Sequence, residues 1–186
     1  MRVVRVATRL IFLVAVVSEI ATSRADQQPP APAGSEKIVL RVGGEVPRPL
    51  TLTAAEFARL PRTSVRIKES SGNETGYEGT PMIEVLKAAG VKFGEDLRGP
   101  ALATYLVVEA SDGYRAVFAL PELDPAFNDR MILLADRRDG QPLGGNEGPL
   151  RIVIPTEKRH SRWVRLVTGL TVQRAPASTA STKAGR

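Results

Sequence analysis

The stretch TYLVVEASDGYRAVFAL, residues 104–120, places two apolar, β-prone runs on either side of Ser111-Asp112-Gly113. An Asp-Gly pair between such runs predicts a tight β-hairpin, because both residues tolerate the backbone angles of that turn. Glu109 and Asp112 also suggest a carboxylate pair for acid–base chemistry, but the turn by itself accounts for Asp112. A hairpin joins antiparallel strands, so the fold is expected to contain an antiparallel sheet.

Around this hairpin the chain predicts two short helices and several more strands. Residues 52–61 place Thr53 and Glu56 at the spacing of a capping box, ahead of a proline. Residues 79–90 place Thr80 at the N-cap, with proline in the first turn and glycine at the end. Strands are expected at residues 37–42, 63–69, 104–110, 114–120, 150–155 and 164–173. Residues 130–140 predict a further strand that runs into a turn at Asp139-Gly140. This pattern indicates an α+β fold with a mixed, mostly antiparallel sheet and few short helices.

Both ends of the chain differ in composition from its centre. Residues 1–25 have a basic head, an apolar run and small residues at their end, which is the layout of a secretory signal peptide. The apolar run is far shorter than the ~20 residues of a membrane span, which favours cleavage over a short membrane anchor. The expected organisation is a signal peptide at 1–25, a Pro/Ala-rich spacer at 26–35, a globular domain at 36–174 and a disordered tail at 175–186. This organisation predicts a periplasmic or secreted protein with no membrane span after cleavage.

Charge and residue usage exclude several functions. The net charge of +6 falls to +3 without residues 1–25, because 22 basic and 19 acidic residues remain, and this balance does not indicate nucleic-acid binding. The chain has no cysteine and one histidine, so thiolate catalysis and cysteine-ligated metals are excluded and no metal ligand is predicted. Glu122, Asp124 and Asp129 suggest a site for a hard cation, but solvated loop charge is the preferred interpretation. No nucleophile elbow occurs, and no catalytic residue is predicted.

The stretch IPTEKRHSRWVR, residues 154–165, concentrates basic residues around the single histidine and the single tryptophan. Two interpretations are open: an anion clamp, or a basic strand whose Trp163 is buried against the sheet. In an extended backbone, His160 and Arg162 would lie on one face, with Arg159 and Trp163 on the other. A clamp that uses Arg159, His160 and Arg162 therefore requires a turn or irregular backbone before Trp163.

Five motifs in order resemble the oxidoreductase molybdopterin-binding domain family, which is sulfite-oxidase-like. They cover essentially the whole globular part. They are YEGTPMIEVLKAAGV at 77–91, VVEASDGYRAVFAL at 107–120, LLADRRDGQPL at 133–143, EGPLRIVIP at 147–155 and RHSRWVRLVTGLTV at 159–172.

The resemblance implies a sulfite-oxidase-like fold and a pocket that holds a molybdenum–pterin cofactor in active members. In those members a basic segment that ends in a basic-Trp pair holds the pterin phosphate. The positions that match it here are Arg159, His160, Arg162 and Trp163. The Asp-Gly-Tyr hairpin turn near the pocket matches Asp112, Gly113 and Tyr114.

One departure from the family bears on catalysis. Active members ligate molybdenum with a cysteine that precedes an aromatic-x-Gly-x-Pro motif, which is matched here by Tyr77, Gly79 and Pro81. The preceding segment, RIKESSGNETG at 66–76, has no thiol. We therefore expect a non-catalytic protein with no cofactor, which binds a small anion, a pterin-like ligand or a periplasmic partner protein. The alternatives are a molybdopterin-dependent oxidoreductase with a non-cysteine metal ligand, and an inert structural envelope protein.

Overall fold

The predicted hairpin forms one end of a five-stranded sheet. The computed structural model describes residues 37–68 and 72–176, so the expected signal peptide, the spacer and residues 177–186 of the tail lie outside the described residues. The elements are β1 (Ile38–Gly44), β2 (Leu50–Thr53), α1 (Ala54–Ala58), β3 (Thr63–Lys68), β4 (Glu74–Pro81), α2 (Met82–Ala88), η1 (Gly94–Asp96), η2 (Gly99–Ala103), β5 (Thr104–Ala110), β6 (Arg115–Ala119), α3 (Leu120–Leu123), β7 (Leu133–Arg138), β8 (Gln141–Pro142), β9 (Arg151–Val153), η3 (His160–Arg162) and β10 (Val167–Arg174).

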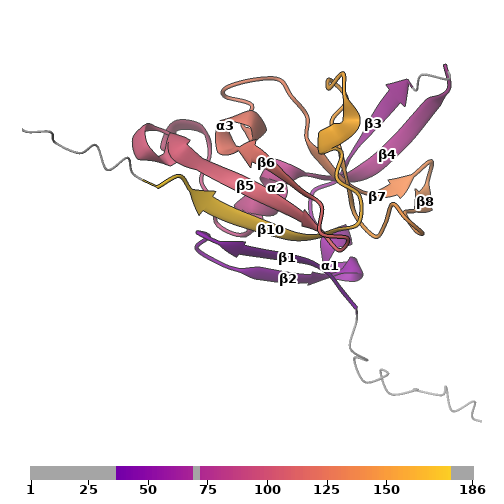
Figure 1. The fold of residues 1–186 in the computed structure, drawn as a ribbon, viewed down its shortest axis with the longest axis horizontal. Coiled ribbons are helices and arrows are strands. Elements are labelled where there is room, and N and C mark those ends of the chain that lie inside the picture. The colour runs from indigo at the N-terminus through magenta and orange to yellow at the C-terminus, as the bar shows by residue number, and fades with distance from the viewer. Residues whose placement is uncertain (1–36, 69–71, 177–186) are drawn as a thin grey trace, which may run out of the picture. The chain divides into compact units, whose positions relative to one another are not determined.

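The first sheet has the strand order β2-β1-β10-β5-β6 (Figure 1). Its first and last strands in sequence, β1 and β10, pair in parallel, and its other pairs are antiparallel. The hairpin β5–β6 turns at Gly113, whose φ of 85° is accessible to glycine at little cost. The predicted hairpin is therefore confirmed, and the sheet is mixed and mostly antiparallel as expected.

The second sheet is antiparallel throughout, with the order β3-β4-β7-β8 and with β9 paired to β7. Strand β4 was not predicted, because Glu, Gly and Thr dominate its sequence and hide its alternation. Gly79 lies at a bulge of β4 against β7. A Cβ atom there would come within 2.1 Å of the Leu134 carbonyl oxygen, so this close approach of two strands requires glycine.

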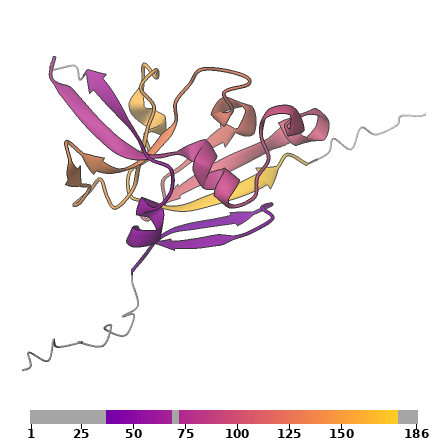
Figure 2. The same cartoon turned by 180° about the vertical axis from the view of Figure 1, so that it is seen from behind.

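The buried apolar residues of the first sheet, of α2 and of β7 and β9 form one core cluster, and α2 lies against one face of the first sheet (Figures 1 and 2). Alternate residues of β5 are buried, and α2 contributes Met82, Val85 and Leu86 with no exposed surface. This alternation is the expected pattern of a sheet that is covered on one face. Among the described residues, no helix has the length and apolar character needed to cross a membrane.

The helix starts were predicted with unequal success. The capping box of α1 is confirmed: the Glu56 amide donates to Thr53 Oγ1 at 3.3 Å, and the Thr53 amide donates to Glu56 Oε2 at 2.9 Å. The N-cap of α2 was wrong, because Pro81 occupies it without a side-chain bond. Thr80 instead pairs with Leu134 in the second sheet. The residue predicted as the helix cap is therefore the next-to-last residue of strand β4.

Candidate functional site

The basic segment after β9 is irregular, as the clamp interpretation required. The chain leaves β9, turns at Pro155, and forms the 3₁₀ turn η3 before β10 begins at Val167. Leu166 has a φ of 55°, a left-handed conformation that ends the segment abruptly. The strand expected from residue 164 therefore starts three residues later, because Trp163 and Val164 turn into the core instead of joining the sheet.

Trp163 and His160 form a stacked pair at the centre of this segment. Their ring centroids lie 3.8 Å apart, with an angle of 18° between the planes. Trp163 is 6% exposed, which confirms that it is buried, and it also meets Tyr77 of β4 edge-on at 6.5 Å. The guanidinium of Arg151 lies 5.6 Å from the Trp163 ring centroid. The indole thus fixes the position of the only histidine, whose own side chain stays exposed.

The hairpin turn reaches the same place from β5 and β6. Asp112 Oδ1 accepts the Tyr114 amide at 3.0 Å, as expected for a turn residue. The Tyr114 hydroxyl donates to the Ser161 carbonyl oxygen at 2.6 Å. Together they border the Tyr114 hollow, a space of about 220 Å³ lined by Asp112, Tyr114, His160, Ser161, Trp163, Val164 and Arg165. Four of the six predicted site residues, Asp112, Tyr114, His160 and Trp163, therefore line one hollow.

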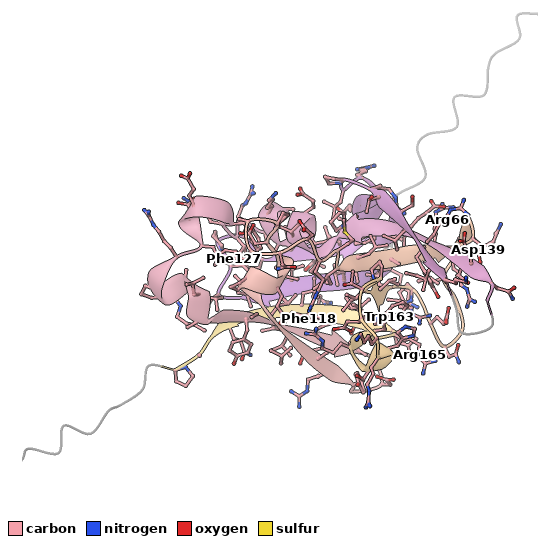
Figure 3. All side chains as sticks on the ribbon, turned by 90° about the horizontal axis from the view of Figure 1, so that it is seen from above. Arg66, Phe118, Phe127, Asp139, Trp163 and Arg165 are labelled. Atoms are coloured by element: carbon pink, nitrogen blue, oxygen red, sulfur yellow. The ribbon has the colours of Figure 1, made fainter. Side chains whose placement is uncertain are left out.

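Arg162 lies apart from that hollow and is already neutralised. Its guanidinium bonds Glu157 Oε1 through Nε and Nη2, and Glu122 Oε2 through Nη1 at 3.0 Å. It also packs over the ring of Phe118, at 4.7 Å from the centroid; Figure 3 shows where Phe118 and Trp163 lie. Burial alone lowers the pKa of Arg162, but the bonds to Glu157 and Glu122 outweigh it and raise the pKa above its ordinary value.

Two carboxylates of the acidic stretch before β7 hold the structure together through hydrogen bonds and ion pairs. Asp124 is 3% exposed, and its oxygens accept the Gly94 amide at 2.6 Å and the Ala126 amide at 2.9 Å. Glu122 binds both Arg130 and Arg162. The interpretation of these two carboxylates as solvated loop charge was wrong, because each binds a residue far away in the sequence. Asp124 accepts a hydrogen bond from Gly94, and Glu122 pairs with Arg162.

His160 also lines a second, larger hollow. We call it the basic hollow; it has about 560 Å³ and is lined by Arg66, Ile67, Lys68, Pro155, Glu157, Lys158 and His160. Its one acidic member, Glu157, is committed to Arg162 through Oε1. Arg159 is exposed and lines neither hollow. The structure thus does not bring Arg159, His160 and Arg162 together on one spot.

The sequence interpretation missed the contribution of β3 to this hollow. Arg66 and Lys68 alternate along β3 and so share a face. Two basic residues at alternate positions of a predicted strand, separated by Ile67, were the available signal. Nothing in the sequence indicated that this face lies beside Lys158 and His160, because that requires the pairing of β3 with β4 and the turn after β9.

Comparison with known proteins assigns the fold just described. A family model described as the oxidoreductase molybdopterin binding domain matches residues 27–181. The chain belongs to this family. A solved structure with the same fold is the sulfane dehydrogenase SoxCD from Paracoccus pantotrophus, with a TM-score of 0.58 and 21% identity. The match covers 75% of this chain and 39% of that chain. No curated protein matches.

Membership of the oxidoreductase molybdopterin binding domain family raises the question of whether these residues fit its cofactor. The full sequence has no cysteine, and residues 37–68 and 72–176 contain no group of three or more His, Asp or Glu side chains that could hold a metal. Glu69, Ser70 and Ser71 lie outside the described residues. The donor set does not fit thiolate-ligated molybdenum, whereas the basic hollow has the charge to hold an anion.

Proposed function

We propose that this chain is an exported, non-catalytic member of the oxidoreductase molybdopterin binding domain family. It binds a small anion or a pterin-like ligand in the basic hollow. The observation that carries the proposal is the convergence of Arg66, Lys68, Lys158 and His160 on one concave space. The absence of cysteine argues against the metal chemistry of active members, because thiolate softness and charge set the properties of such a site.

The charge balance of the hollow supports this ligand class. Lys68, Lys158 and His160 make no ion pair among the residues that the structure describes, and Arg66 has only a 3.8 Å contact with the exposed Glu74. The ion pair with Arg162 offsets the charge of Glu157. Phosphate, sulfate or carboxylate groups are the natural partners of such donors. The Trp163-supported imidazole adds a flat surface beside the charges, which suits a ring-bearing anion.

Calorimetric titration with phosphate, sulfate and a pterin phosphate tests the proposal. The variant Lys68→Ala/Lys158→Ala is expected to bind about tenfold more weakly, and wild-type binding should weaken as salt rises. Arg159→Ala is the matched control: it removes an exposed charge of the same segment that does not line the hollow. Equal, negligible binding by all three proteins contradicts the proposal. Loss only in Arg159→Ala favours the clamp that the family resemblance implies.

A further inference from the structure

The first sheet has a second face, opposite to the one that α2 covers (Figures 1 and 2). Its side chains are exposed or half-buried, in alternation with the buried residues of the same strands. A hollow of about 580 Å³ lies on this face over β1, β2, β10 and the end of β5. We call this second face of the sheet the outer face. Its hollow is separate from both hollows around His160, since it shares no lining residue with them.

The strand register places five residues in one row across the outer face. In order from β2 to β6 they are Thr51, Arg41, Gly169, Glu109 and Arg115. The two strands that flank β10 thus carry opposite charges, with a residue that lacks a side chain between them. A neighbouring row contains Gly43, Thr171, Val107 and Val117.

Within residues 37–68 and 72–176 these three charges are not neutralised by an oppositely charged side chain. Arg41, Glu109 and Arg115 form no ion pair among the described residues, although Glu109 and Arg115 are directly opposite in the register. Glu109 leans the other way: Oε2 lies 3.5 Å from the Thr171 hydroxyl and 3.4 Å from where a Cβ of Gly169 would be. The carboxylate therefore extends over the bare glycine, toward the strand that carries Arg41.

We propose that the outer face binds a second copy of this chain, face to face, about a two-fold axis that runs parallel to β10, over Gly169 and midway between the two sheets. Such an axis exchanges the two sides of the row, so Arg41 of each copy faces Glu109 of the other and Gly169 faces Gly169. Packed sheets lie ~10 Å apart, a gap that arginine and glutamate side chains can close together. The absence of side chains at Gly169 leaves room for both pairs.

The same axis makes the apolar row complementary. It places Val107 of one copy over Gly43 of the other, where a Cβ would have no atom within 4 Å. Val117, which is 51% exposed, then faces the other copy next to β2, where Pro49 lines the hollow. An axis across the strands instead sets Arg41 against Arg41 and Glu109 against Glu109. Like charges opposed in this way are unfavourable, so the charge pattern selects the parallel axis.

Sedimentation equilibrium of the full chain tests the proposal by charge reversal. Arg41→Glu and Glu109→Arg are each expected to raise the dimer dissociation constant at least about tenfold. Mixing these two variants restores association, because each copy then meets opposite charges in both pairs. Arg41→Glu/Glu109→Arg restores it as well. Arg98→Glu is the matched control, a charge reversal at another exposed arginine that lines none of the three hollows, and it should leave association unchanged.

Thermal unfolding by circular dichroism confirms that each variant is folded, and the mixing experiment avoids any dependence on the double variant. A wild-type chain that stays monomeric at the highest concentration overturns the proposal. So does a mixture of the two single variants that associates no better than either alone. Binding of a small zwitterion at Arg41 and Glu109 by a monomeric wild-type chain also overturns it, in favour of a dipolar ligand site.

Discussion

The hairpin at 104–119 and the segment at 154–166 meet at the Tyr114–Ser161 hydrogen bond, yet different forces hold them. The hairpin follows from neighbours in sequence: a paired ladder, a glycine at the turn and an aspartate that accepts its own backbone. The segment has little regular structure and depends on side chains that reach distant elements, such as Arg162 to Glu122 and Trp163 to Tyr77. A region of the first kind tolerates substitution, while a region of the second kind should fail when one anchor is removed.

Removal of the Trp163 anchor should have the largest effect. Trp163→Ala is expected to lower the free energy of unfolding by ~3–5 kcal/mol, the usual cost of a large core truncation. It also removes the support of the His160 ring, so anion affinity should fall with stability. Urea unfolding followed by circular dichroism measures the loss. A change below ~1 kcal/mol would show that the segment is not anchored by its indole.

The Arg162 ion pairs should rank second. Arg162→Met removes the cation that pairs with Glu157 and leaves Glu122 with Arg130 alone. It is expected to cost about 1–3 kcal/mol, the range for hydrogen bonds to charged groups. Adding Glu157→Gln to that variant should recover part of the loss, because one unpaired carboxylate is then neutral. Arg159→Ala, exposed in the same segment, serves as control and should stay within about 0.5 kcal/mol of wild type.

The link between the two regions should matter less. Tyr114→Phe removes only the hydroxyl that donates to the Ser161 carbonyl, with an expected cost of about 0.5–1.5 kcal/mol. Hydrogen exchange should speed up in residues 157–163 and remain unchanged in the ladder of β5 and β6. Equally faster hydrogen exchange in both regions would mean that the hairpin depends on the segment, and would contradict the proposed difference between them.

The smallest effect is expected at a purely local contact, the capping box of α1. Hydrogen bonds from the Thr53 amide and then its hydroxyl lower the pKa of Glu56. The ionised Glu56 carboxylate therefore contributes to folding stability above the ordinary pKa of glutamate. This contribution is lost as pH falls through the lowered pKa that Glu56 has in the folded protein. Glu56→Gln should reduce the melting temperature slightly at about pH 7, and this difference should shrink in acid. A difference in melting temperature between the two proteins that grows in acid would contradict the expected pH dependence.

Local patterns predicted what local contacts build. The hairpin turn, the Thr53–Glu56 box and the turn after β7 all follow from adjacent residues, and all are present. Strand β2 was not predicted: only its last two residues, Leu52 and Thr53, were assigned, to the stretch of the first helix, and four residues carry little periodicity. Residue 120 was assigned to a strand, although Leu120 begins α3.

The site was only partly predictable for the same reason. Asp112, Tyr114, His160 and Trp163 were selected by the family resemblance and lie around one hollow. The partner of Arg162, Glu122, is 40 residues away, and no sequence rule connects them. The basic face of β3 joins the site through sheet pairing alone. Of the three residues assigned to one clamp, Arg162 forms structural ion pairs, His160 lines the basic hollow, and Arg159 is exposed outside both hollows.

We propose above that this family member binds an anion without molybdenum. The most direct measurement is the metal and pterin content of the protein purified from the compartment in which it naturally occurs. Elemental mass spectrometry should find molybdenum far below stoichiometric amounts, and native mass spectrometry should show a bound anion or pterin that Lys68→Ala/Lys158→Ala loses. Stoichiometric molybdenum in the wild-type protein would contradict the proposal and support an oxidoreductase with a non-cysteine metal ligand.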